Sequence, residues 1–154
     1  MIAVVQRVTE AEVIVAEPPH RAAIGPGLCV LLAVEQGDQD ADAAWMAGKL
    51  ARLRIFRDDH DKMNRSVQDT GGAVLVVSQF TLAGDCTKGN RPSFIGAAAP
   101  DEGERLYQAV AQVLSRDHGL HVATGVFGGD MKVRLVNDGP VTLIVRRAPG
   151  GGTG

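Results

Sequence analysis

The sequence lacks several features that would assign a function directly. It holds two cysteines in 154 residues, Cys29 in an apolar run and Cys86 in a polar segment. We therefore expect reduced thiols in a cytoplasmic protein, with a single disulfide as the alternative. The longest apolar run, residues 28–34, has the length of a strand, and the N-terminal residues resemble neither a signal peptide nor a membrane span. A formal net charge of −2 argues against a broad basic face that coats nucleic acid, but it permits a local contact with one end of an RNA.

Familiar catalytic and nucleotide-binding motifs are also missing. The sequence contains no Gly-x-Ser-x-Gly elbow, no Gly-x-Gly-x-x-Gly pattern and no P-loop. None of the four histidines (His20, His60, His118 and His121) stands beside a candidate nucleophile. The acidic run at 58–61 lacks the spacing of a calcium loop and indicates a solvated turn, so we expect no metal site.

The pattern of apolar residues predicts one α/β domain, rich in strands, with two main helices. Helices are expected over residues 38–53 and from Pro100 to about Gly119, because acidic residues crowd both starts. Residues 28–34 and 73–77 are apolar throughout and should be strands covered on both faces. Residues 83–99 predict a long loop, and 148–154 predict a flexible glycine-rich tail behind a domain of residues 1–147. The other strands are expected over residues 1–8, 12–16 (paired back on the first), 22–24, 54–57, 122–127, 131–136 and 141–145.

Polar residues follow the apolar strand 73–77 in the stretch "SQFTL", residues 78–82. This stretch either continues the strand with alternating polar positions or presents backbone N–H groups at a rigid rim, where they could form an oxyanion hole. In the loop that follows, Lys88, Arg91 and Ser93 either contact phosphate or belong to an ordinary mobile loop. A second unusual stretch, "NDGPVT" at 137–142, places Gly and Pro between two expected strands and predicts a stiff turn.

The two stretches together resemble the D-aminoacyl-tRNA deacylase family, the chiral-proofreading enzymes of translation. Further similar segments follow in the same order: "QRV" at 6–8, "IGPGL" at 24–28, "KMN" at 62–64, "RPSF" at 91–94 and "DMKVRLVNDGPVT" at 130–142. The resemblance runs from about residue 1 to residue 145. Minor departures are Ala33, Gly129 and the proline-rich connection at 17–20.

This resemblance implies a single-domain, layered mixed β-sheet with a barrel-like shape and a homodimer without metal or organic cofactor. It implies an editing hydrolase that cleaves the ester of D-aminoacyl-tRNA, and also of mischarged glycyl-tRNA, with help from the 2′-hydroxyl of the tRNA. Ser78, Gln79, Phe80 and Thr81 would form the catalytic pocket. Gly139 and Pro140, joined by a cis bond, would reach into the partner's pocket and reject L-aminoacyl-tRNA. Met131 and Arg7 would complete the substrate-binding residues, and Lys88 and Arg91 are the candidate RNA contacts.

Two other functions remain open from the residues alone. One is a tRNA-binding module without chemistry, which would bind tRNA and leave the aminoacyl group in place. The other is a small-ester hydrolase with Thr81 or Ser78 as nucleophile, which would form an acyl-enzyme that can be trapped. The sequence does not indicate which D-amino acids or tRNAs are preferred, nor how the acceptor stem docks.

Overall fold

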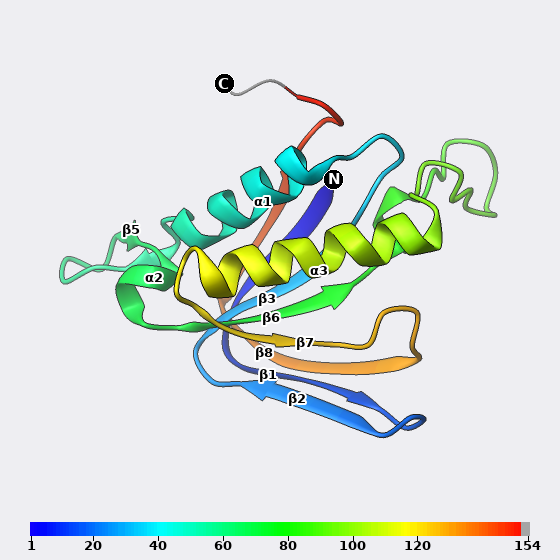
Figure 1. Ribbon diagram of the computed structural model, residues 1–154. Coiled ribbons are helices and arrows are strands. Elements are labelled where there is room, and N and C mark those ends of the chain that lie inside the picture. The colour runs from blue at the N-terminus through cyan, green and yellow to red at the C-terminus, as the bar shows by residue number, and fades with distance from the viewer. Residues whose placement is uncertain (152–154) are drawn as a thin grey trace.

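The computed structural model of the chain describes residues 1–151, and it shows helices layered on a strongly curved mixed sheet (Figure 1). The sheet strands are β1 (Ile2–Val15), β2 (His20–Ile24), β3 (Gly27–Ala33), β6 (Ala73–Ser78), β7 (His121–Thr124) and β8 (Met131–Arg146). A separate small pair consists of β4 (Phe56–Arg57) and β5 (Met63–Arg65). The helices are α1 (Asp40–Arg52), α2 (Val67–Thr70) and α3 (Pro100–Arg116), and a short 3-10 helix, η1 (Phe80–Ala83), follows β6.

The long strand β1 organises the sheet. Its first half pairs with β3 and its second half with β2, while β8 pairs antiparallel along the other edge of both halves. On the far side of β3, strands β6 and β7 continue the sheet in parallel orientation, so the sheet is mixed, as expected.

The sheet curls until β2 approaches β7, which gives the fold its barrel-like shape. Figure 1 shows β2, the second half of β1 and the first half of β8 folded beneath the layer of β3, β6 and β7. The His20 Nε2 atom lies 2.8 Å from the Thr124 carbonyl oxygen, and this hydrogen bond joins the two approaching strands. The predicted layered, barrel-like α/β fold is therefore confirmed.

Two apolar cores fill the two sides of the central strands. Leu28, Val30 and Leu32 of β3 pack toward α1 and α3, whereas Cys29 faces the interior of the curl together with Leu75 and Val77 of β6. This alternation explains why both strands are apolar throughout. Burial raises the pKa of the Cys29 thiol to about 11, so this thiol stays protonated, and Cys86 is a free, exposed cysteine.

Both main helices form where the sequence predicts them. Helix α1 begins at Asp40 and not at 38, because Asp38 is buried beside the amino group of Met1, at 2.9 Å. Helix α3 begins at Pro100 and packs against α1 above the sheet (Figure 1). No helix in the described part of the chain is long and apolar enough to cross a membrane.

Two predicted chain reversals are wrong. Residues 12–16 do not fold back on residues 1–8, because β1 runs straight through both as one strand of fourteen residues. Residues 137–142 are likewise no turn between two strands, since β8 runs in one direction from Met131 to Arg146. In both cases the neighbouring strands supply pairing along the whole length, which local turn chemistry does not reveal.

The remaining differences concern strand ends and short elements. The expected strands 54–57 and 122–127 shorten to β4 and β7, and α2, β5 and η1 were not predicted. At the C-terminus, the Gly150 N–H donates to Asp42 Oδ2 at 3.1 Å, so residues just after the domain lie against the start of α1. Residues 152–154 of the expected tail lie outside the described residues.

Candidate functional site

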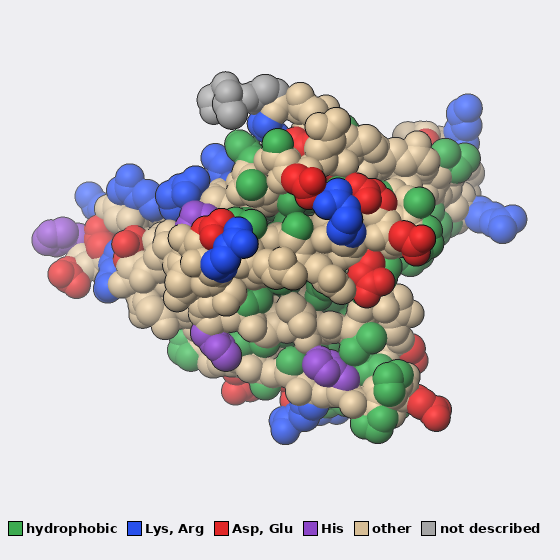
Figure 2. Space-filling model, in the orientation of Figure 1, with side chains coloured by type: hydrophobic (Ala, Val, Ile, Leu, Met, Phe, Trp, Pro, Cys, Tyr) green, Lys and Arg blue, Asp and Glu red, His purple; other side chains and the backbone are tan. Residues whose placement is uncertain are grey.

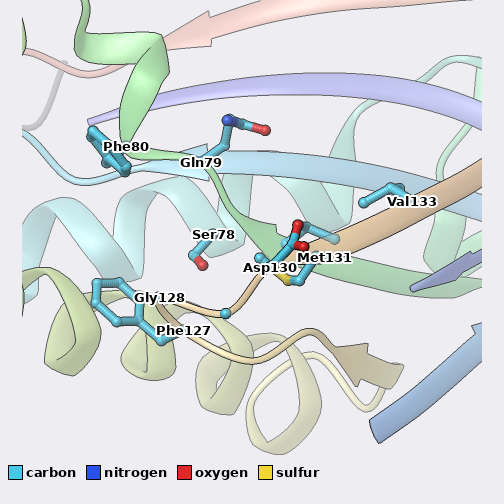
Figure 3. Close-up of a pocket in the computed structure, with 10 residues that line it drawn as sticks. Ser78, Gln79, Phe80, Phe127, Gly128, Asp130, Met131 and Val133 are labelled. Carbon is cyan, nitrogen blue, oxygen red and sulfur yellow. The ribbon is translucent and has the colours of Figure 1, made fainter. Parts of the chain in front are cut away.

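A cavity of about 260 Å³ opens where β6 ends (Figure 3). One wall is the exit of β6, from Val77 to Phe80, and the opposite wall is the connection from β7 into β8, residues 127–131. Val133 of β8 completes the lining. The structure thus brings together four of the predicted site residues: Ser78, Gln79, Phe80 and Met131.

The end of β6 is shaped by hydrogen bonds that hold the chain at the rim. The Gln79 N–H donates to the Leu32 carbonyl at 2.8 Å, after which the chain turns into η1. Thr81 lies in η1, outside the cavity lining, and its Oγ1 accepts a hydrogen bond of 2.6 Å from Gln79 Nε2. The stretch 78–82 is therefore neither a continued strand nor a flexible loop, but a strand end followed by a tight helical turn.

Aromatic side chains form the outer edge of the cavity. Phe80 is 56 % exposed and meets Phe94 edge-to-face, with ring centroids 5.2 Å apart. Phe127 lies on the opposite wall and contacts Tyr107 of α3, with centroids 6.0 Å apart. The Tyr107 hydroxyl donates to the Val76 carbonyl at 2.8 Å, and burial raises the pKa of this phenol to about 12. Tyr107 is thus a structural support for β6 and stays protonated at neutral pH.

The cavity brings no nucleophile next to a base. Its polar side chains are Ser78, Gln79 and Asp130, and the Asp130 carboxylate binds Lys132 Nζ at 2.9 Å. No histidine or cysteine appears among the lining residues. Within residues 1–151, no group of three or more His, Cys, Asp or Glu side chains could hold a metal ion. The arrangement can hold an apolar group against aromatic walls and offer backbone donors at the end of β6.

Gly139 and Pro140 lie in a short excursion of β8. Val8 of β1 pairs with Asn137 and Gln6 pairs with Thr142, so the residues between them bulge out of the ladder opposite Arg7. Asn137 closes the bulge, because its Oδ1 accepts from the Val141 N–H at 2.8 Å and its Nδ2 donates to the Val141 carbonyl at 3.2 Å. The Gly139–Pro140 peptide bond is cis, and Gly139 has a φ of 144°.

Arg7 holds this bulge from behind. Its side chain is buried; its Nε donates to the Asp138 carbonyl at 3.0 Å, and its Nη1 donates to the Ile55 carbonyl at 2.6 Å. The Nε also lies 3.2 Å from the Asp138 carboxylate. Arg7 therefore supports Gly139 from the protein interior and is not a lining residue of the cavity.

Within one chain, the bulge and the cavity are far apart. Arg7 of β1 pairs with Leu28 of β3, which in turn pairs with Val74 of β6. Ser78 lies four residues further along β6, which corresponds to about 13 Å. Along β8, Asn137 pairs with Val8 and Met131 with Val15, which separates them by about 20 Å. The structure thus separates two groups of predicted site residues: Ser78, Gln79, Phe80 and Met131 lie at the cavity, whereas Arg7, Gly139 and Pro140 lie at the bulge.

The candidate RNA contacts lie in the loop beyond η1. Asp85 and Ser93 exchange two backbone hydrogen bonds of 2.7 and 2.9 Å, so the loop narrows at its base. Lys88 and Arg91 are exposed beyond that base. Figure 2 shows Lys and Arg side chains projecting from the end of the molecule where this loop lies in Figure 1.

Comparison with known proteins places the chain in a family. Residues 4–146 match the family model described as D-Tyr-tRNA(Tyr) deacylase. A protein of Geobacter sulfurreducens called D-aminoacyl-tRNA deacylase is 58% identical over 145 residues, which cover 94% of each chain. The chain belongs to the D-aminoacyl-tRNA deacylase family. This family consists of ester hydrolases, and the resemblance noted in the sequence is confirmed.

Two solved structures have the same fold as this chain over nearly its whole length. The structure titled c-Myc DNA Unwinding Element Binding Protein superposes with a TM-score of 0.88 at 38% identity, covering 96% of this chain and 99% of the other. A structure described as a probable eukaryotic D-amino acid tRNA deacylase gives a TM-score of 0.79, covering 94% and 97%. At 19% identity, this second likeness shows the fold alone.

Several lining residues of this cavity were missed from the sequence: Phe127, Gly128, Gly129, Asp130 and Val133. The sequence predicted a strand over residues 122–127, whereas β7 ends at Thr124, so the connection that forms this wall was not recognised. The glycine pair at 128–129 was the available signal, since glycines after a short strand favour a connection over a continued strand.

Proposed function

We propose that this protein hydrolyses the ester bond between a D-amino acid and the 3′ end of tRNA, releasing free tRNA and the D-amino acid. The observation that carries this proposal is the cavity at the end of β6, where Ser78, Gln79 and Phe80 meet Met131 without a nucleophile–base pair. Family membership supports the same reaction. We further propose that it acts in the cytoplasm, where aminoacyl-tRNA is used.

In this proposal the protein contributes position and electrostatics, and the RNA contributes the assisting group. The ester lies against the end of β6, and the backbone N–H groups of Phe80 and Thr81 face the oxyanion that develops as water attacks. The 2′-hydroxyl of the terminal ribose orients and assists this water. Since no side-chain base is needed in such a mechanism, a cavity without histidine or cysteine is sufficient.

The selectivity for D-amino acids is proposed to come from a second copy of the chain. The bulge at Gly139–Pro140 lies too far along β8 to complete the cavity of its own chain, so the partner's bulge would fill that role. Glycine adds no side chain and proline locks φ, which together give a stiff backbone edge. An L side chain would collide with this edge, a D side chain would point away from it, and glycyl-tRNA would be accepted because it carries only hydrogen there.

The free edge of β8 supports the homodimer that this arrangement needs. β8 pairs with β1 on one side, and within the described residues no strand covers its other edge. Val136, Leu143 and Ile144, which flank the bulge, are between 37 and 64 % exposed. A long edge strand with exposed apolar side chains is a surface that proteins usually cover.

Matched D- and L-aminoacyl-tRNA provide the direct test. Incubation with each substrate, followed by measurement of ester loss, should show rapid release of the D-amino acid only. Binding of tRNA without ester loss would favour the RNA-binding module. Equal cleavage of a small ester without tRNA, with a trapped acyl-enzyme, would favour the small-ester hydrolase.

The substitution Thr81→Ala should keep a substantial part of the activity. The Thr81 hydroxyl accepts a hydrogen bond from the amide of Gln79, and an amide cannot act as the base that a nucleophilic threonine requires. We expect kcat/KM for D-aminoacyl-tRNA to fall by less than about tenfold, against several orders of magnitude for the loss of a true nucleophile. An inactive but folded Thr81→Ala protein with normal tRNA affinity would contradict the RNA-assisted mechanism.

Replacing Lys88 and Arg91 by alanine should weaken tRNA binding. Both side chains are exposed beyond the loop base, and each phosphate contact releases counterions when it forms. The slope of log Kd against log salt should therefore fall by up to about 2 in the double variant. If the slope stays that of the unmodified protein, this loop does not contact the RNA.

A further inference from the structure

A second groove, of about 430 Å³, lies along the C-terminal half of α1 and shares no lining residue with the cavity at the end of β6. Trp45 and Gly48 form part of it, and three cationic side chains line it: Lys49, Arg52 and Arg54. In Figure 2, Lys and Arg side chains gather at the upper left, over the end of α1 and beside β5 as drawn in Figure 1. We call the surface formed by Trp45, Lys49, Arg52 and Arg54 the basic groove.

The cations of the basic groove are not engaged in close ion pairs within residues 1–151, although Arg54 lies near enough to Asp69 to help lower the pKa of that carboxyl. Within residues 1–151, none of the three forms an ion pair with a carboxylate, whereas Arg21, Arg116 and Arg134 elsewhere on the surface each do. Lys49 Nζ lies 5.3 Å from the centre of the Trp45 ring, and Arg54 donates to the carbonyl and the side-chain oxygen of Asn64 at 2.9 Å each. Their charges are therefore available to an external anion.

Gly48 helps to shape this groove. It is buried inside α1, where glycine costs roughly 1 kcal/mol of helix stability relative to alanine. A Cβ atom at this position would lie 2.7 Å from the Arg52 Nη2 atom. The missing side chain thus leaves the space in which the Arg52 guanidinium folds back along the helix.

One side chain connects the basic groove to the Gly139–Pro140 bulge. Arg54 is followed by Ile55, whose carbonyl accepts the 2.6 Å hydrogen bond from Arg7 Nη1. The same guanidinium donates from Nε to the Asp138 carbonyl at 3.0 Å. The end of the groove and the bulge therefore lie within about one arginine side chain of each other.

We propose that the basic groove binds backbone phosphates of the tRNA acceptor arm, and that it does so for the cavity of the partner subunit. This inference rests on the proposed function, in which Gly139–Pro140 of one subunit enters the cavity of the other. Because Arg7 joins the end of the groove to this bulge, the groove would then lie beside the opening of the partner's cavity. Cations that form no close ion pair suit phosphate, because binding releases the counterions of the RNA and breaks no ion pair in the protein.

The first test removes the three charges in the full-length protein. In Lys49→Ala/Arg52→Ala/Arg54→Ala, KM for D-aminoacyl-tRNA should rise on the order of tenfold while kcat stays within about twofold, since the groove touches no reacting atom. The slope of log Kd against log salt for deacylated tRNA should fall by about 2 to 3. The matched control, Arg21→Ala/Arg116→Ala/Arg134→Ala, also removes three exposed cations and should change neither quantity.

The second test asks which subunit's groove serves which cavity. Two differently tagged chains are co-expressed, and the mixed dimer is purified through both tags. One chain carries the triple groove substitution with an intact cavity, and the other carries an intact groove with the cavity blocked by Ser78→Trp. The mixed dimer then has one functional cavity, in the chain whose groove is substituted. Its KM for D-aminoacyl-tRNA should equal that of the unmodified protein, because the other chain supplies the intact groove.

Each outcome decides a separate point. An elevated KM in this mixed dimer would show that the groove serves its own chain and would overturn the proposal. An unchanged salt slope for deacylated tRNA in the triple variant would overturn it as well, whatever the activity. If the unmodified protein binds tRNA but releases no D-amino acid, the proposed function fails, while the salt slope still reports on the groove.

Discussion

A D-aminoacyl-tRNA that ends in 2′-deoxyadenosine, with the amino acid on the 3′ oxygen, should be cleaved at least about 100-fold more slowly than the intact substrate. The reason is the composition of the cavity, where Ser78, Gln79 and Asp130 are the polar side chains and Asp130 is paired with Lys132. None of them forms a base–nucleophile pair, and in the proposed mechanism the assisting group comes from the RNA. Removing that group takes away the general-base contribution, which is typically 10²- to 10⁴-fold.

The measurement is single-turnover release of labelled D-amino acid, with each rate divided by the spontaneous rate of the same ester in buffer. This division matters because the 2′-hydroxyl also affects how fast the ester hydrolyses without protein. A tRNA with a deoxyribose one nucleotide earlier is the matched control and should be cleaved normally. Similar rate enhancements for the intact and 2′-deoxy substrates would mean that the protein supplies the base, and the mechanism proposed here would be wrong.

The substitution Gly139→Ala should lower kcat/KM for D-aminoacyl-tRNA by about two orders of magnitude. Gly139 has a φ of 144°, which side-chain-bearing residues rarely adopt, and such strain costs on the order of 1–3 kcal/mol. A Cβ there would lie 2.7 Å from Val141 Cγ2, 2.9 Å from the Val141 nitrogen and 3.3 Å from Arg7 Nη2. The bulge would have to shift, and a displacement of about 1 Å at a reacting centre can cost about 100-fold in rate.

A second glycine provides the control for this experiment. Gly119 also has a positive φ, of 65°, but a Cβ there would meet no atom within 4 Å. Gly119→Ala places a side chain at a positive φ in the milder left-handed helical region and makes no such contact, so it should leave the activity near that of the unmodified protein. The prediction fails if Gly139→Ala retains full D-specific activity, or if the two variants lose activity equally while remaining dimeric.

The two proposed RNA-binding surfaces, the loop with Lys88 and Arg91 and the basic groove, would have different roles. Lys88 and Arg91 lie in the loop that leaves the cavity of their own chain, whereas the basic groove would act on the cavity of the partner. A tRNA end held from both subunits would account for RNA recognition by a chain whose net charge is −2, because few cations are needed when they converge on one phosphate track.

The sequence by itself determined the elements whose signals are local. The strands around residues 28–34 and 73–77 were predictable from continuous apolar runs, and α1 and α3 from helical spacing with acidic starts. The stretch 78–82 could be singled out because polar residues directly follow a buried strand, and family resemblance pointed to the same residues. These predictions depend on chain neighbours alone, and so they could be made without coordinates.

Only the tertiary structure decided the rest, because it depends on pairing between residues far apart in the chain. The bulge at Gly139 is not a turn, since β1 pairs with β8 on both sides of it, and Arg7 is a buried support, since Ile55 and Asp138 come together around it. The second wall of the cavity forms because the sheet curls until the β7–β8 connection faces the end of β6. Curvature and strand pairing are properties of the whole sheet, and no local stretch of the sequence encodes them.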